Sequence, residues 1–395
     1  MADYNVVVDP TTERLQLTTW FRDLEDAVID EGRCIQCGAC EAVCPTDSIG
    51  VGHDDLPELV KSCIGCGRCW DHCPRGGLRY ERQWTITGGA DNVSGAGDPI
   101  TEFTARTGAE WRSKAQDGGV VTAMLVSLLE AGEIDGALVA RESEDEPWKG
   151  EGFLATTTAE LLESAGSYYN QTMALGHLDL DRWAEKLPDK PRSELQLAVV
   201  GTPCEVEGLC SLEDFDRDYG AQEAGLDAVE YRIALMCTKN FNHEKLIGEK
   251  LHRDRDIAPD EIGKLDIIEG VLRVYDHDGE LFHEEPIEEF HDAALKGCSE
   301  CADFTGYTAD VTVGSVGSPD GYSSVIVRTE AGMQAWEAAE PRLEATDLAD
   351  RGAIGGLQSW DKKQAFEALE RPFDPDAPRF IDYEDHVEQY SASEE

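Results

Sequence analysis

Eight of the thirteen cysteines lie in two short runs that share one spacing, C-x2-C-x2-C-x3-C-P, at residues 34–45 and 63–74. Three thiolates at this spacing can wrap one iron-sulfur cube, and the fourth cysteine, after a short helix, reaches towards a neighbouring cube. A glycine follows the second cysteine of each run, at Gly38 and Gly67, where a side chain would crowd a cluster or require an unfavourable positive φ. The spacing therefore predicts two [4Fe-4S] clusters.

Disulfide bonds and paired zinc sites are the alternatives for these cysteines. Zinc sites typically combine two C-x2-C or Cys/His pairs a dozen or more residues apart, and these runs have a different spacing. A disulfide framework needs an oxidising compartment, and the N-terminus shows no apolar signal segment. The iron-sulfur interpretation is therefore favoured.

The two runs resemble the bacterial two-cluster ferredoxin module. Ligation in that module is crossed, so the resemblance implies that each run lends its last cysteine to the other cluster. One [4Fe-4S] cluster would be held by Cys34, Cys37, Cys40 and Cys73, and the other by Cys63, Cys66, Cys69 and Cys44.

The 395-residue chain is strongly acidic, with 81 Asp and Glu against 34 Lys and Arg and a formal charge of −47. A nucleic-acid partner would require a basic face, so no nucleic-acid partner is expected. Acids spread over the whole chain repel one another less at molar salt, where the screening length falls from about 10 Å to about 3 Å. We therefore expect a cytoplasmic protein of a haloarchaeon. A low-complexity acidic chain is disfavoured, because 41% of the residues are hydrophobic.

Length and patterning divide the chain into about two to three domains. No apolar run approaches the roughly 18 residues that span a bilayer, so we expect a protein that docks peripherally at most. The fold class is α+β, in which a two-cluster ferredoxin module precedes a mixed α/β domain. The expected segments are a ferredoxin-like domain at 1–83, a Gly-rich linker at 84–103, the α/β domain at 104–345, and a C-terminal extension with an acidic tail at 346–395.

Hydrophobic periodicity places the expected elements. In the module we expect a strand at 4–8, an amphipathic helix at 19–29 and a closing strand at 77–81. The larger domain should contain helices at 118–129 and from Glu205, and a hairpin at 272–286 with Asp278-Gly279 at its tip. Apolar strands are expected at 136–140, 195–201, 231–236, 309–313 and 325–328.

Five further cysteines lie in the larger domain, at Cys204, Cys210, Cys237, Cys298 and Cys301. Cys204 and Cys237 each follow an expected strand, and strand ends at one edge of a sheet converge in space. Ligands distant in sequence can therefore surround one cluster there. A redox-active pair at Cys298 and Cys301, a zinc site, and buried thiols remain open alternatives.

An ordered set of short motifs is similar to the beta-subunit family of coenzyme F420 hydrogenases and dehydrogenases over about 110–330. The matching segments are Gln116–Thr122, Gly201–Cys204, Cys237, Cys298–Thr305, Ala309-Asp310, Gly314–Gly317 and Val325–Thr329. The resemblance implies that the α/β domain binds FAD and a [4Fe-4S] cluster. It also implies electron transfer between reduced deazaflavin and an iron-sulfur chain. Related proteins include the input subunit of the membrane F420 dehydrogenase complex and the plant hydroxymethyl-chlorophyll reductase.

The resemblance implies that Cys204, Cys237, Cys298 and Cys301 hold the third cluster and that Cys210 is a spectator. An exchange between Cys204 and Cys210 stays open on sequence alone. The chain also departs from the family pattern twice. Glu205 stands where the family more often has glutamine, and Ser167-Tyr168-Tyr169 replaces a common Ser-Lys-Tyr, which removes a lysine charge near the flavin.

Flavin contacts are expected around the motifs. The free N–H groups at the start of the helix after Gly118 and Gly119 suit a pyrophosphate, unless Asp117 simply caps that helix. Glycines after strands let backbone approach a cofactor closely, although they also serve ordinary tight turns. Lys239 and Asn240 can reach a flavin carbonyl or face water. The full set of candidate flavin-binding residues is Gln116, Asp117, Gly118, Gly119, Thr122, Ser167, Gly201, Thr202, Lys239, Asn240, Asp303, Gly314 and Gly317.

The implied activity is electron transfer between coenzyme F420, as substrate, and an iron-sulfur or quinone-linked acceptor. A deazaflavin donates a hydride whereas a cluster accepts single electrons, so FAD is needed to divide the pair. The expected partner is a ferredoxin, a quinone-linked complex or a reductase subunit. The alternatives are a non-catalytic relay subunit and a ferredoxin-dependent reductase of an organic substrate. The sequence assigns no catalytic acid or base.

Overall fold

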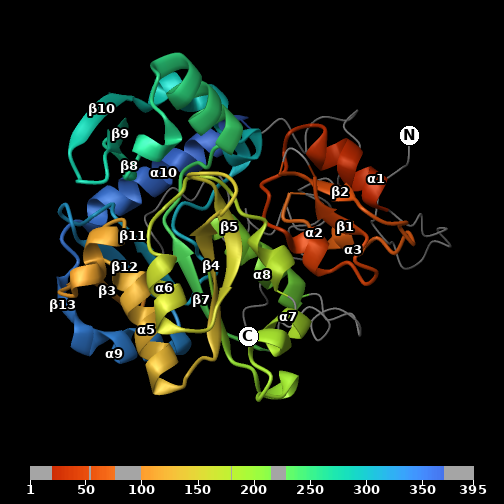
Figure 1. The fold of residues 1–395 in the computed structure, drawn as a ribbon, viewed down its shortest axis with the longest axis horizontal. Helices are drawn as coiled ribbons and strands as arrows, with labels where there is room; N and C mark the ends of the chain where they lie inside the picture. The colour runs from red at the N-terminus through yellow and green to blue at the C-terminus, as the bar shows by residue number, and fades with distance from the viewer. Residues whose placement is uncertain (1–19, 53–54, 76–98, 179, 215–227, 369–395) are drawn as a thin grey trace.

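The computed structural model describes residues 20–52, 55–75, 99–178, 180–214 and 228–368. The small N-terminal module packs against one side of a larger domain built around a sheet (Figure 1). The strands expected at 4–8 and 77–81, residues 84–98 of the expected linker, and residues 369–395, which include the expected acidic tail, lie outside the described residues.

The module contains two short helices that begin at the glycines of the cysteine runs. Gly38 and Gly67 are their N-caps, with φ of 84° and 79°, so the predicted need for glycine is confirmed. The predicted amphipathic helix also forms, in two parts, and buries Phe21, Leu24 and Val28. The elements are α1 (Phe21–Leu24), η1 (Glu25–Ile29), α2 (Ala39–Ala42), β1 (Ile49–Val51), β2 (Pro57–Leu59) and α3 (Arg68–Asp71).

The larger domain is organised by an eight-stranded mixed sheet in the order β13-β3-β12-β11-β7-β6-β4-β5. Its four central strands, β4, β6, β7 and β11, are parallel. The five predicted strands are present, whereas β3, β5 and β13 were not predicted, and β3 includes three residues expected in the linker. The strands are β3 (Thr101–Thr107), β4 (Gly136–Glu142), β5 (Gly150–Ala155), β6 (Leu197–Gly201), β7 (Val229–Leu235), β11 (Val311–Gly314), β12 (Ser323–Val327) and β13 (Leu343–Asp347).

Alternation along β6 explains how both faces of the sheet are covered. Ala198 joins a core with α5 and α9, whereas Leu197 and Val199 join a core with α7, α8 and the module. None of the helices in the described part of the chain is long and apolar enough to cross a bilayer. The helices are α5 (Val120–Ala131), α6 (Thr158–Glu163), α7 (Leu180–Lys186), α8 (Pro203–Asp214), α9 (Glu330–Ala339) and α10 (Arg351–Ala368).

A second, three-stranded sheet packs on the π-helix η6 (Glu244–Arg253) and forms its own core. The predicted hairpin is confirmed as β9 and β10, with Gly279 at its tip at φ 82°. The strands are β8 (Lys264–Ile268), β9 (Val271–Tyr275) and β10 (Leu281–Pro286). Short 3₁₀ helices connect the domain, namely η2 (Glu110–Lys114), η3 (Ala174–His177), η4 (Arg192–Glu194), η7 (Pro259–Glu261), η8 (Ile287–Ala293), η9 (Lys296–Glu300) and η10 (Glu340–Arg342).

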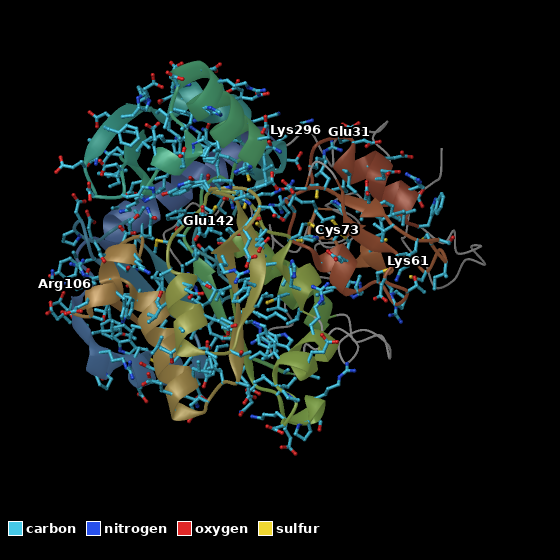
Figure 2. All side chains as sticks on the ribbon, in the orientation of Figure 1. Glu31, Lys61, Cys73, Arg106, Glu142 and Lys296 are labelled. Atoms are coloured by element: carbon cyan, nitrogen blue, oxygen red, sulfur yellow. The ribbon has the colours of Figure 1, made fainter. Side chains whose placement is uncertain are left out.

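The module is fixed to the larger domain by backbone hydrogen bonds as well as by packing. The N–H groups of Met173 and Leu175 donate to the carbonyls of Gln36 and Cys37, each at 3.1 Å. At the upper edge of the contact, Lys296 Nζ donates to the Glu31 carbonyl at 2.8 Å (Figure 2). The first cysteine run is therefore held directly against η3 and η9.

Candidate iron-sulfur and flavin site

The eight cysteines of the module line two separate cavities of similar size; the space between their walls is about 350 and 310 Å³, a volume that includes open solvent. The cysteines of the first cavity are Cys34, Cys37, Cys40 and Cys73, and those of the second are Cys44, Cys63, Cys66 and Cys69. These are the two sets that crossed ligation implies. We call them the near group and the far group, because the first lies against the larger domain.

Backbone N–H groups point at the sulfurs of both groups. The N–H of Gln36 donates to Cys34 Sγ at 3.4 Å, and the N–H of Gly65 donates to Cys63 Sγ at 3.3 Å. Burial raises the pKa of Cys34 to about 12, so an isolated thiol there would keep its proton. Bound iron would displace that proton, and N–H donors to sulfur would stabilise the resulting thiolates. All thirteen cysteines are free thiols, which disfavours a disulfide framework.

A third group of four cysteines lies at the carboxyl ends of the central parallel strands. Cys204 follows β6 and Cys237 follows β7, and these strands are adjacent and parallel. Burial raises the pKa of Cys237 well above its usual range, and the neighbouring thiols of Cys298, Cys204 and Cys301 raise it further. The four thiols therefore lie close together, with Cys204 buried and the other three partly buried.

Cys210 does not join this third group. Its Sγ lies 3.9 Å from the Thr308 carbonyl, and it packs with Val206, Ala234 and Ala309. Six residues along a helix correspond to a rotation of about 120° from Cys204. This orientation supports Cys204 as the ligand.

The geometry also bears on the zinc alternative. Within the described ranges, no three Cys, His, Asp or Glu side chains are placed to hold a single metal ion. One zinc ion draws its sulfurs to about 2.3 Å, whereas a four-iron cube carries each thiolate on a different iron. The arrangement of the described cysteines thus offers no support for a single zinc ion.

Polar groups around the third group are suited to a cluster. Gln171 Nε2 donates to Cys204 Sγ at 3.1 Å, and the Asn240 N–H donates to Cys298 Sγ at 3.5 Å. The Asn240 Nδ2 donor is buried and has no partner among the described residues. A buried donor left over in this way fits an acceptor on a bound group.

Helix α10 holds the Cys298–Cys301 loop from outside. Gln358 Oε1 accepts hydrogen bonds from the N–H groups of Phe304 and Thr305, both at 3.2 Å, and its Nε2 donates to the Ala302 carbonyl at 2.9 Å. Asp303 was expected near the flavin, but its carboxylate accepts the N–H groups of Thr305, Gly306 and Tyr307. Asp303 therefore holds the turn after the cysteines.

The start of α5 is buried and has no side-chain cap. Gly119 is the N-cap with φ 70°, and no side chain caps the helix, so Asp117 does not act as the cap. Gly118 packs tightly, because a Cβ there would lie 2.4 Å from the Ala105 carbonyl. Thr122 is buried in the first turn. Free N–H groups at the positive end of a 12-residue helix suit a phosphate.

Gln116, in the loop before α5, contacts strand β8 of the second sheet. Its Nε2 donates to the Leu265 carbonyl at 3.0 Å, to Asp266 Oδ1 at 3.2 Å and to Tyr169 Oη at 3.3 Å. Ser167, partly buried, precedes Tyr169 in the same loop. The Gln116 amide is thus already used within the protein, which favours a structural role for it.

Three of the candidate glycines face protein atoms. A Cβ at Gly201 would lie 2.9 Å from Glu205 Cβ, one at Gly314 would lie 2.5 Å from Met236 Cβ, and one at Gly317 would lie 2.8 Å from Ile354 Cγ1. Their small size is thus explained by packing. Only their backbone groups remain available to a cofactor.

Glu205, which departs from the family pattern, stabilises the turn before Cys204. Its Oε2 accepts from the Thr202 N–H at 2.8 Å, and its Oε1 accepts from Thr172 Oγ1 at 3.3 Å. Burial raises the pKa of Glu205, and the hydrogen bonds from Thr202 oppose that rise. Thr202 and Glu205 are therefore tied to each other beside the third group.

Lys239 lies close enough to Asp361 of α10 for its charge to act on that carboxyl. Burial raises the pKa of Asp361 to about 8, and the Lys239 charge opposes the rise. Sequence reasoning missed Gln171, Gln358 and Asp361, because they carry no metal-ligand spacing and come from elements without cysteine.

We predict that Asp117→Asn stabilises the protein at neutral pH but much less at acidic pH. Burial, followed by repulsion from Asp266, raises the pKa of Asp117 from 3.8 to about 6. The folded state then holds the proton more tightly than the unfolded state, so stability falls as pH rises from about 4 to about 6. The gain in the free energy of unfolding should approach about 3 kcal/mol at pH 7.5.

Chemical unfolding at pH 4 and pH 7.5, at one fixed flavin content, measures this gain. Glu110→Gln, which changes an exposed carboxylate, is the matched control and should change little at either pH. An equal gain from Asp117→Asn at both pH values would contradict the prediction.

The chain matches three family models. Residues 26–74 match a 4Fe-4S dicluster domain. Residues 103–179 and 195–351 match the N-terminal and C-terminal models of the coenzyme F420 hydrogenase/dehydrogenase beta subunit. The two predicted parts of the chain, a ferredoxin-type module and a domain of this beta-subunit type, are therefore confirmed.

Curated relatives of the chain include two F420-linked proteins of methanogenic archaea. A coenzyme F420-dependent sulfite reductase of Methanocaldococcus jannaschii is 35% identical over 79% of this chain, which spans 47% of that protein. A coenzyme F420 hydrogenase subunit beta of Methanosarcina barkeri is 31% identical over 62% of this chain and 79% of its own length.

The solved structure is the F420-reducing [NiFe] hydrogenase complex of Methanosarcina barkeri. One chain of it superposes with a TM-score of 0.61 and 27% identity, covering 70% of this chain and 92% of that chain. Family models, relatives and fold agree on one assignment. The chain belongs to the coenzyme F420 hydrogenase/dehydrogenase beta-subunit family and is an F420-linked iron-sulfur oxidoreductase subunit.

Proposed function

We propose that the protein passes electrons between coenzyme F420 and an iron-sulfur or quinone-linked acceptor, using FAD and three [4Fe-4S] clusters. We further propose that it works in the cytoplasm of a halophile, as its formal charge of −47 suggests. Bound flavin supplies the conversion between hydride transfer and single-electron transfer.

The arrangement of twelve cysteines as three consecutive groups carries this proposal. The near group lies beside α8, since a Cβ at Gly208 would be 3.4 Å from Cys37 Sγ. It also lies beside the far group. Burial and the thiols of the near group raise the pKa of Cys40 most, and the Cys69 thiol of the far group raises it further. Three groups in series suit a path for electrons from the larger domain outward.

The residues of the larger domain would bind and orient the flavin. The uncapped N–H groups at the start of α5 suit its pyrophosphate. Asn240, whose backbone N–H contacts Cys298, supplies a buried Nδ2 donor, and Lys239 supplies a positive charge one residue earlier. The protein would thus set orientation and potential, and the chemistry would belong to the cofactors.

The far group is the expected exit to a partner. Cys66 is exposed, and the side chain of Ile64 beside it is 64% exposed. In Figure 2, Lys61, which precedes this run, lies on the side of the module away from the larger domain, whereas Cys73 faces that domain. A redox partner protein, such as a ferredoxin, a subunit of a quinone-linked complex or a reductase subunit, would dock there.

An assay in molar salt tests the function. Anaerobically prepared holoprotein should oxidise reduced F420 with a viologen acceptor, should not oxidise NADPH, and should contain about twelve irons per chain and bound FAD. A pure relay subunit would instead show only iron-sulfur absorbance, without flavin. No oxidation of reduced F420 by protein that carries both cofactors would exclude the deazaflavin substrate and favour the organic-substrate reductase.

A further inference from the structure

The side-chain amide of Gln171, in the loop that precedes η3, contacts a cysteine of the third group. Gln171 is buried, and its Nε2 donates to Cys204 Sγ and to Thr202 Oγ1, each at 3.1 Å. A primary amide carries two N–H hydrogens, so these two hydrogen bonds use both of them. The amide is therefore held between a hydroxyl at the end of β6 and the sulfur of Cys204.

The hydroxyl of Thr202 leaves Gln171 as the side-chain donor to Cys204. Thr202 Oγ1 also lies 3.1 Å from Cys204 Sγ, but it donates to Glu205 Oε2 at 3.1 Å. A hydroxyl carries a single hydrogen, so it cannot serve the carboxyl oxygen and the sulfur at the same time. The hydrogen bond of the amide to the sulfur is therefore not duplicated by Thr202.

The backbone around Gln171 is fixed on both sides. Before it, Asn170 Nδ2 donates to the carbonyls of Gly150 and Gln171, at 2.9 and 2.8 Å, and Asn170 Oδ1 accepts from the Gly150 N–H at 2.8 Å. After it, the N–H groups of Met173 and Leu175 donate to the first cysteine run. The Gln171 amide is thus oriented before any cluster binds, as a group that tunes a metal centre requires.

A donor to a ligand sulfur affects the reduction potential of a cluster. Each electron that the cluster accepts adds negative charge, which an N–H dipole aimed at the sulfur stabilises, so the donor raises the potential. The effect is stronger at a buried site, where the dielectric constant is low. The other donor described at this group, from Asn240 to Cys298, is a backbone N–H, whereas a substitution can remove that of Gln171.

We propose that Gln171 is a positioning residue that, through its hydrogen bond to Cys204, raises the reduction potential of the third cluster alone. The hydrogen bonds described for its amide are those to Cys204 and Thr202, in the larger domain. A rise in one potential changes both neighbouring steps, because it favours transfer from the flavin to the third cluster and opposes transfer onward to the near cluster. The proposal rests on the three-cluster function proposed above.

The test compares the unaltered holoprotein with Gln171→Met, whose side chain has a similar length and no N–H donor. Potentials are measured by redox titration followed by EPR in molar salt. Gln171→Met should lower the reduction equilibrium constant of the third cluster about tenfold, or about 59 mV for a one-electron couple. The near and far clusters should keep their potentials. Gln171→Asn, whose amide is one methylene shorter, should lower the third potential by less.

Thr172→Val is the matched control, because the Thr172 hydroxyl lies in the same loop but donates to Glu205 Oε1. It should keep all three potentials and all the iron. If only one of the two Gln171 variants keeps the third cluster, that variant should still show the lower potential. The proposal is overturned by an unchanged third potential in a variant that keeps the cluster, by loss of the cluster in both, or by equal shifts in Thr172→Val or at all three clusters. Fewer than three clusters in the unaltered protein would instead refute the proposed function.

Discussion

Cys204→Ser is expected to remove the third cluster and to disconnect reduced F420 from the module. Iron content should fall from about twelve to about eight atoms per chain. The rate at which reduced F420 reduces the near and far clusters should fall at least roughly 100-fold, a loss that misplacement of a reacting group alone can cause. Rapid-mixing EPR measures these rates, while a small chemical reductant should still reduce both module clusters.

Cys210→Ser is the matched control for this variant. Cys210 lies on the same helix but packs with Val206, Ala234 and Ala309. It should keep all the iron and the full rate, with at most a small loss of stability from a buried hydroxyl. Loss of iron in Cys210→Ser together with its retention in Cys204→Ser would assign the ligand to Cys210 instead.

The module was predictable from sequence because its ligands are local. Within each run three ligands fall in a span of seven residues, and the helix that contains the third is fixed by a glycine at positive φ. The central parallel strands were equally visible, since strands buried on both faces read as short apolar runs, as at Leu197–Gly201. The edge strand β13 was missed because its side chains are mostly exposed, so it carries no apolar pattern.

The site was only partly predictable, because its supports come from distant segments. Asp303 matched a motif, yet its carboxylate binds backbone N–H groups of its own turn. Gln358 holds the cysteine loop from α10, within a range expected only as an extension. The module docks through contacts between residues far apart in the chain, and the spacing of the cysteines does not predict such contacts.

The docking itself depends on Gly38, and Gly38→Ala is expected to weaken it strongly. A Cβ there would lie 2.5 Å from both the Gly176 nitrogen and the Met173 carbonyl oxygen, which are backbone atoms. Segment 173–176 would have to move, and the hydrogen bonds from Met173 and Leu175 to the first cysteine run would lengthen. The alanine side chain at positive φ, the overpacking and the weakened hydrogen bonds together should lower the free energy of unfolding by about 3 to 5 kcal/mol.

Gly65→Ala separates this clash from backbone strain. Gly65 also has a positive φ, 71°, but nothing lies within 4 Å of its Cβ position. The equivalent place in the first run is occupied by Gln36 at φ 52°, so a side chain is tolerated there. Gly65→Ala should therefore cost no more than about 1–2 kcal/mol.

Chemical unfolding of the two holoproteins measures the loss of stability. EPR of the near cluster during reduction by reduced F420 measures the rate of electron transfer. Gly38→Ala should unfold at lower denaturant than Gly65→Ala, and electrons should reach its near cluster more slowly, because separation of the two parts lengthens the transfer step. Gly65→Ala should transfer electrons at the unaltered rate. Equal stability and equal rates in the two variants would show that contact between the first cysteine run and residues 173–176 does not hold the module in place.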